Sequence, residues 1–181
     1  MVSLTKIIAY FSLKVKKIYL YFFGELWYTV NRKRFTRPTG ARKGKEMRLI
    51  VCIDERKGLL FCGKRQSQDR VLRERVLERV KDERLLLSPY SFKQFGEHPA
   101  IAVSQNPLAE AKKDDYYFLE DKDFSLKDCQ EVILYHWNRH YPSTVKFDVD
   151  LKKEGYRLSL REDFKGSSHD KITEEIWTKE N

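Results

Sequence analysis

Residues 47–53, MRLIVCI, form an apolar run rich in β-branched residues, which is typical of a strand buried on both faces of a sheet. This run constrains the fold more than any other feature, because a sheet has to be built around it. The 46 residues before it differ in composition. The sequence therefore predicts one domain over residues 47–181, preceded by a separate segment over residues 1–46.

The charge distribution supports this boundary. The formal net charge is +9, and eleven of the 36 Lys and Arg residues lie in residues 1–46 beside only two acidic residues. Residues 47–181 therefore hold 25 basic and 25 acidic side chains and are neutral. A neutral domain gives no electrostatic argument for binding nucleic acid.

The first segment is aromatic and basic, and two interpretations of it remain open. Three lysines, Lys14, Lys16 and Lys17, interrupt the apolar stretch 7–30, so no run is long enough to span a membrane. Residues 1–30 could contact an anionic membrane surface, and residues 31–46 would then be a flexible linker. Alternatively, translation starts at Met47, which is the interpretation we favour.

Strands and helices alternate in the first part of the domain, and strands follow one another in the second. The clearest helix is expected over residues 67–84, with Ser67 as its N-cap and with Leu72, Val76 and Val80 as its buried stripe. This order predicts an α/β fold: a single sheet with flanking helices and antiparallel strands at the C-terminal end. Further strands are expected at 59–61, 84–87, 100–103, 116–119, 131–137, 145–149, 156–160 and 172–177, with short helices at 89–95 and 107–112.

The same order resembles a shortened dihydrofolate reductase. Residues 47–60 are similar to that family's opening strand and active-site loop, and residues 67–76, SQDRVLRERV, resemble the start of its acid-bearing helix. Residues 84–95, 100–106 and 131–164 resemble its later strands and helix. The resemblance implies that Asp69 is an acid that protonates a ring nitrogen of a ligand, and that Ser104 would contact a cofactor phosphate.

Two departures from that family concern the cofactor. Ser88-Pro89 stands where the family has a Gly-Arg pair that meets the cofactor phosphate. Glu120-Asp121 stands where paired glycines approach the pyrophosphate, and two carboxylates would repel a diphosphate. We therefore expect no NADPH binding, no other cofactor and no active reductase.

Three blocks resemble a group of short bacterial proteins that are often labelled ribonuclease Z. The blocks are KRQSQDRVLRER at 64–75, LYHWNRHYP at 134–142 and GSSHDKIT at 166–173. The H-x-H-x-D-H motif of a dinuclear zinc enzyme is absent, and none of the four histidines has a suitable spacing. We therefore predict no metal site.

Two groups of residues are candidates for ligand binding: Gln66, Gln68, Asp69 and Arg73 at the helix start, and Asn138, Arg139 and His140 after a strand. Asp69 either faces a pocket or pairs with Arg73 one turn along the helix. A pocket acid predicts that Asp69→Asn is neutral to stabilising, which we expect, whereas a surface pair predicts a small loss. The run 166–170, GSSHD, is interpreted as a turn, because adjacent side chains rarely form a triad.

These features predict a cytoplasmic protein that binds a small molecule on a dihydrofolate-reductase-like fold, without reductase activity. The three cysteines, Cys52, Cys62 and Cys129, form no C-x-x-C motif, which favours a reducing compartment. Two alternatives remain open. The first is an enzyme, either a residual reductase or a ribonuclease, and the second is a protein-interaction module.

Overall fold

The computed structural model describes residues 46–81, 83–122 and 124–180. The predictions for residues 1–45, which concern the linker, the membrane contact and the start of translation, lie outside the described residues and stay predictions. No helix within the described ranges is both long enough and apolar enough to cross a membrane.

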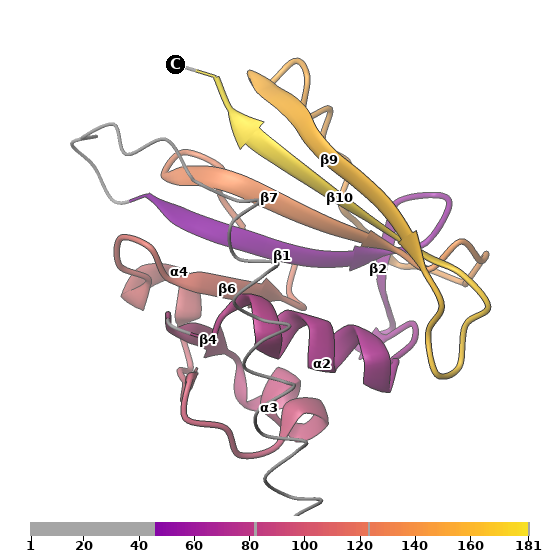
Figure 1. The fold of residues 1–181 in the computed structure, drawn as a ribbon, viewed down its shortest axis with the longest axis horizontal. Coiled ribbons are helices and arrows are strands. Elements are labelled where there is room, and N and C mark those ends of the chain that lie inside the picture. The colour runs from indigo at the N-terminus through magenta and orange to yellow at the C-terminus, as the bar shows by residue number, and fades with distance from the viewer. Residues whose placement is uncertain (1–45, 82, 123, 181) are drawn as a thin grey trace, which may run out of the picture. The chain divides into compact units, whose positions relative to one another are not determined.

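A seven-stranded mixed sheet forms the centre of the domain, in the order β5-β4-β6-β1-β7-β10-β9 (Figure 1). Strands β5, β4, β6, β1 and β7 run parallel, while β10 is antiparallel to both β7 and β9. This arrangement confirms the predicted α/β class with antiparallel strands at the C-terminal end. The bounds are β1 Met47–Ile53, β4 Leu85–Leu87, β5 Ile101–Val103, β6 Tyr116–Leu119, β7 Cys129–His136, β9 Tyr156–Phe164 and β10 Ile172–Lys179.

A small second sheet accompanies the large one. It consists of β2 (Gly58–Phe61), β3 (Lys64–Arg65) and β8 (Val145–Lys146), in the antiparallel order β3-β2-β8. The prediction of a single sheet missed it, because strands of two residues leave no periodic pattern in the sequence.

Within the described ranges, three helices lie near the expected positions, but the one expected over 67–84 is shorter at both ends. They are α2 (Arg70–Arg79), α3 (Pro89–Phe95) and α4 (Pro107–Glu110). The predicted start and N-cap of α2 were wrong, because Asp69 rather than Ser67 caps the helix. Asp and Ser cap helices about equally well, so the sequence alone could not separate two candidates two residues apart.

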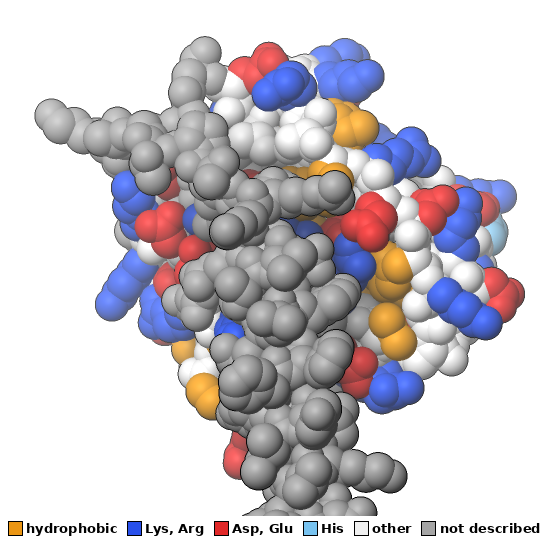
Figure 2. Space-filling model, viewed as in Figure 1, with side chains coloured by type: hydrophobic (Ala, Val, Ile, Leu, Met, Phe, Trp, Pro, Cys, Tyr) orange, Lys and Arg blue, Asp and Glu red, His pale blue; other side chains and the backbone are white. Residues whose placement is uncertain are grey.

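Opposite charges are intermixed on the surface of the domain. Figure 2 shows Lys and Arg side chains beside Asp and Glu over the part of this face that the grey residues leave visible. This pattern agrees with the equal numbers of basic and acidic residues in 47–181.

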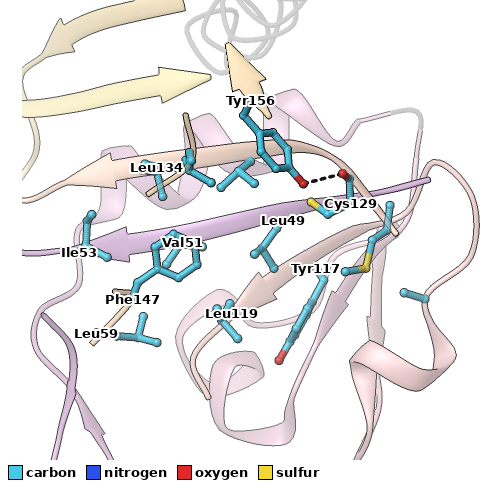
Figure 3. Packing of buried hydrophobic residues seen from close by; sticks show 14 of the residues in the cluster. Leu49, Val51, Ile53, Leu59, Tyr117, Leu119, Cys129, Leu134, Phe147 and Tyr156 are labelled. Carbon is cyan, nitrogen blue, oxygen red and sulfur yellow. Dashed lines mark hydrogen bonds between the residues drawn. The ribbon is translucent and has the colours of Figure 1, made fainter. Parts of the chain in front are cut away.

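Strand β1 is buried on both faces of the large sheet, as its apolar run predicts, whereas the edge strand β9 is mostly exposed. Ile50 of β1 packs with Leu72 and Val76 of α2 on one face. Leu49 and Val51 point to the other face, where loops and α4 cover them (Figure 3). On that second face the Tyr156 hydroxyl donates to the Cys129 carbonyl oxygen at 2.7 Å, and thereby ties β9 to the start of β7.

The carboxyl ends of β1, β6 and β7 lie at the same edge of the sheet, since these neighbouring strands are parallel and in register. Asp54 follows β1, Glu120 follows β6 and Trp137 follows β7. Ligands of α/β sheets bind outside the carboxyl ends of the strands. The candidate site is therefore sought at this edge.

Candidate functional site

Asp69 is a buried carboxylate, 2% exposed, at the N-cap of α2. Its Oδ1 atom accepts hydrogen bonds from the backbone N–H groups of Val71, Leu72 and Ser167 at 2.9, 3.2 and 3.0 Å. Its Oδ2 atom accepts from the backbone N–H and the hydroxyl of Ser168 at 2.7 and 2.9 Å. Burial raises the pKa of Asp69, but these hydrogen bonds outweigh burial and lower it well below its usual value.

Neither hypothesis for Asp69, a pocket acid or an ion pair with Arg73, accounts for all of its contacts. The residue is buried, as a pocket acid would be, but loop 166–169 occupies both of its oxygens. Arg73 forms no ion pair with Asp69 within the described residues, and only its backbone N–H reaches the Asp69 carbonyl oxygen, at 3.2 Å. Gly166 makes this approach possible, since a Cβ atom there would lie 2.6 Å from Asp69 Oδ2.

His169 is buried beside Asp69 and links its own loop to two other segments of the chain, 67–69 and 137–141. Its Nδ1 atom lies 3.3 Å from Asp69 Oδ2. Its Nε2 atom lies 3.2 Å from the Ser67 hydroxyl and 3.1 Å from the Tyr141 hydroxyl. Its ring stacks on Trp137, with centroids 4.7 Å apart. The run 166–170 is therefore a turn, as predicted, but one whose histidine is directed at side chains distant in sequence.

The second predicted group, Asn138 to His140, does not join Asp69. Asn138 has a φ of 51° and donates from Nδ2 to Thr173 Oγ1 at 3.0 Å, so it is a turn residue that ties β7 to β10. Arg139 and His140 are exposed. Gln68 is exposed as well and accepts a hydrogen bond from the Ser168 hydroxyl on its carbonyl oxygen.

Gln66 and Asp69 are the predicted residues that line one pocket at this edge, whereas His140 lines a separate, more open pocket with Tyr141 and Lys146. The Gln66 Nε2 atom donates to the Pro142 carbonyl oxygen at 3.2 Å and approaches Asp54 Oδ2 at 3.4 Å. These two acceptors fix the orientation of the amide, so that Oε1 faces away from them. Asp54 is buried, and its Oδ1 accepts from the backbone N–H of Gly58 at 2.6 Å. Burial raises the pKa of Asp54, but backbone hydrogen bonds lower it overall.

The pocket lies between β1, β6, α2 and α3 and has an apolar base. Its apolar side chains are Cys52, Leu59, Leu72, Phe118, Leu119 and Trp137. Its polar side chains are Arg65, Gln66, Ser67, Asp69, Gln94 and Glu120. The space that water can enter is about 10 Å³, which is room for one water molecule.

Glu120 and Arg65 line this pocket and form an ion pair within it. The Glu120 side chain is 7% exposed, and its Oε1 atom lies 3.1 Å from Arg65 Nε. The Arg65 guanidinium also stacks on the Tyr90 ring at 4.3 Å and donates to the Tyr90 carbonyl oxygen at 2.8 Å. Burial raises the pKa of Glu120, and the positive charge of Arg65 opposes this only in part.

Several polar atoms of this pocket have no hydrogen-bond partner within the described residues. They are Glu120 Oε2, Gln66 Oε1 and Gln94 Nε2, although the side chains of Ser91 and Gln94 lie close enough to Glu120 to lower its pKa. A buried polar group without a partner costs about 1–3 kcal/mol, so such groups are rare and call for an explanation. We refer to this cavity, with Arg65, Gln66, Gln94 and Glu120 as its polar members, as the Glu120 pocket.

Most of the Glu120 pocket was not predicted from the sequence. Glu120 was noted only as the residue that stands where dihydrofolate reductases have a glycine, and Arg65 and Gln94 were not among the candidate site residues. One signal was available for Glu120: an acid directly after the apolar strand 116–119 must lie at the carboxyl edge of the sheet. Arg65 and Gln94 gave none, because their positions depend on β3 and α3 packing at this edge. Within the described ranges, no three His, Cys, Asp or Glu side chains are grouped as a metal site would require.

Comparison with known proteins identifies the fold. The chain is similar in structure to dihydrofolate reductase from Enterococcus faecalis complexed with NADP(H) and RAB-propyl, with a TM-score of 0.56 and 10% identity. The match covers 75% of this chain and 97% of that one. The fold is therefore like that of dihydrofolate reductase, and the identity is too low to carry more than the fold. No protein-family model and no curated protein matches the sequence.

Proposed function

We propose that the domain binds a small molecule in the Glu120 pocket and is not an active NADPH-dependent reductase. One observation supports the proposal: a buried carboxylate oxygen, Glu120 Oε2, makes no hydrogen bond of normal geometry at the edge of the sheet where ligands of α/β proteins bind, and only the nearby side chains of Ser91 and Gln94 contribute to lowering its pKa beside Arg65. Two amide atoms in the same pocket, Gln66 Oε1 and Gln94 Nε2, also make no hydrogen bond of normal geometry. Unsatisfied groups that converge on one cavity are typical of a binding site.

The polarity of these atoms describes the ligand. Glu120 and Gln66 offer acceptors, so the ligand presents N–H or O–H donors toward them. Gln94 offers a donor, so the ligand carries an acceptor on that side. The apolar base, which includes Phe118 and Trp137, favours a flat body. Each satisfied group contributes about 1–3 kcal/mol, which is the cost of leaving it unpaired.

Ligand entry requires Arg65 to move, because the pocket has room for only one water molecule. The Arg65 side chain is held at the pocket by its contacts with Glu120 and the Tyr90 ring. Arg65 belongs to the two-residue strand β3 at the edge of the small sheet. The residues Gln68, Arg73, Arg139 and His140 would contact only a part of the ligand that extends out of the pocket. Asn138 and Asp69 would act on the ligand through the loops that they hold.

The expectation that NADPH does not bind rests on the positions at which dihydrofolate reductases hold the phosphates of this cofactor. Ser88 caps α3 by accepting from the Ser91 N–H at 3.1 Å, and Pro89 at the first helical position has no N–H to offer. The Ser104 hydroxyl accepts from the Asn106 N–H at 2.9 Å and is engaged in a turn. Glu120 adds negative charge where a diphosphate would have to lie.

A thermal-shift screen of the full chain tests the proposal. Folates, other amino-substituted heterocycles, nicotinamide nucleotides and RNA are compared for the wild type, Glu120→Gln and the matched control Asp121→Asn, whose side chain is exposed. We expect a heterocycle to stabilise the wild type and the control but not Glu120→Gln. Equal stabilisation of all three proteins would show that the ligand binds elsewhere. The RNA arm tests the ribonuclease alternative, and cleavage of that RNA would contradict the proposal.

We also propose that the protein resides in a reducing cytoplasm. All three cysteines lie within the described residues, and none forms a disulfide. Cys52 lines the Glu120 pocket. Burial raises the pKa of its thiol, and the negative charge of Glu120 raises it further. A thiol of this kind is unreactive at neutral pH and acts as a small apolar side chain.

A further inference from the structure

The side chains of Asp69, His169 and Ser67 form a connected chain of carboxylate, imidazole and hydroxyl. Asp69 Oδ2 lies 3.3 Å from His169 Nδ1, and His169 Nε2 lies 3.2 Å from Ser67 Oγ. The acid and the histidine are buried, at 2% and 3% exposed, whereas Ser67 is half-buried. Ser67 and Asp69 are two positions apart, but His169 lies 100 positions beyond Asp69, so the fold rather than a local turn brings the histidine to them.

This order of groups is that of an activated nucleophile. A hydroxyl becomes nucleophilic when a base accepts its proton and a third group orients that base. The ionised Asp69 favours a proton on Nδ1 of His169, which leaves the Nε2 lone pair directed at Ser67. The stack on Trp137 fixes the plane of the ring. Both distances are long for hydrogen bonds, as such contacts often are before a substrate binds.

The surroundings of Ser67 suit a small acyl substrate. Ser67 is half-buried at the edge of the Glu120 pocket, whose free space holds only one water molecule, so an acyl substrate has to reach Ser67 from the solvent side. The hydrogen bonds of the described residues leave the backbone N–H groups of Ser67 and Gln68 unused. Both groups lie just before the first turn of α2 and could donate to a developing oxyanion. Tyr141 competes for His169, since its hydroxyl also reaches Nε2 at 3.1 Å.

We propose that Ser67 is a nucleophile for acyl transfer from small esters, with His169 as its base and Asp69 as a positioning residue. Ser67 Oγ bonds to the acyl carbon while its proton passes to His169 Nε2. The bond from that carbon to the leaving oxygen breaks, and the leaving oxygen takes the proton. Water then attacks the acyl-serine by the same proton transfers, releasing the acid and restoring Ser67. This activity does not depend on the ligand of the Glu120 pocket.

Two probes test the proposal on the full chain: p-nitrophenyl acetate as substrate and a fluorophosphonate as a serine-trapping reagent. We expect a burst of p-nitrophenol, and a rate that falls by about 100-fold in Ser67→Ala, the usual contribution of such a base and nucleophile. The matched control, Ser143→Ala, changes a serine of similar burial that lies outside the contacts of Asp69 and His169 described above and should react as the wild type does. Acetate release that is equal in wild type and Ser67→Ala would overturn the proposal.

Peptide mapping of the trapped wild-type protein keeps the test independent of variant folding. The expected adduct is on Ser67 in the native protein and is lost after denaturation in urea, because only the fold supplies His169. His169→Gln should lose the adduct if its far-UV circular dichroism is native. An adduct spread over several serines, or no adduct at all, would show that the three residues only fasten loop 166–169 to α2.

Discussion

Replacing Asp69 by Asn is the most informative stability test, because it changes one oxygen of a carboxylate whose two oxygens both accept hydrogen bonds. The amide nitrogen has to take the place of Oδ2, since Oδ1 accepts from three backbone N–H groups. It then faces the Ser168 N–H, donor against donor, while the Ser168 hydroxyl can rotate to accept. A lost hydrogen bond to a charged group is worth about 1.5–3 kcal/mol, so we expect a loss of about 2–4 kcal/mol at pH 7. The sequence predicted that Asp69→Asn is neutral to stabilising, whereas these hydrogen bonds predict that it lowers the free energy of unfolding.

Urea denaturation of wild type, Asp69→Asn and the exposed neighbour Asp170→Asn measures this loss. The control should stay within about 0.5 kcal/mol of wild type. The folded pKa of Asp69 is depressed, so its contribution is complete above the unfolded pKa of about 3.9 and is lost as the pH falls through the folded value. The difference between wild type and variant should therefore shrink below about pH 4 and hardly change with salt. A neutral or stabilising Asp69→Asn, or a loss that salt removes, would refute the reasoning.

Four further predictions concern two buried contacts, the domain boundary and the cofactor. Gly166→Ala should destabilise by about 1–3 kcal/mol, because its Cβ atom would meet Asp69 and Ile172 Cδ1, and an unchanged urea midpoint would argue against the close approach. Glu174→Gln should cost about 2–4 kcal/mol in the same assay, because Glu174 is fully buried between Arg75 and Arg79. The control Glu162→Gln, half exposed, should cost less than about 1 kcal/mol. Removing residues 1–46 should leave the melting temperature unchanged, and a drop of several degrees would move the domain boundary. NADPH at micromolar concentration should give no saturable fluorescence enhancement, and a saturable signal would restore the reductase alternative.

The fold was predictable where periodicity is strong. The apolar run at 47–53 indicated the central strand, and Leu72, Val76 and Val80 indicated the buried stripe of α2, which the structure shows. Strands β2 and β8 of the small sheet were expected near 59–61 and 145–149, but their separate sheet and β3 were not predictable, because β3 has two residues and depends on pairing with β2 rather than on its own pattern.

The candidate site was predictable only in part. Asp69 and Gln66 were identified by their place at the start of a helix, and both lie at the pocket. The partners of Asp69 could not be identified, because Ser168 and His169 lie about 100 residues away and no local pattern links them. Glu120 was interpreted through what it replaces in another family. Its own environment, a buried oxygen without a partner, is a tertiary property that emerges only when β6, α3 and Arg65 come together.

The most direct test of the central claim, ligand binding in the Glu120 pocket, is to follow the side-chain amide signals of Gln66 and Gln94 by NMR. Both signals can be assigned from single Gln→Glu variants, and the titrant is the heterocycle that stabilises the wild type most in the thermal-shift screen. The account predicts that these two signals shift together and saturate, because both amides line the pocket with an unpaired atom. It also predicts that the shifts disappear in Glu120→Gln. Saturable binding that leaves both amide signals in place would contradict the account.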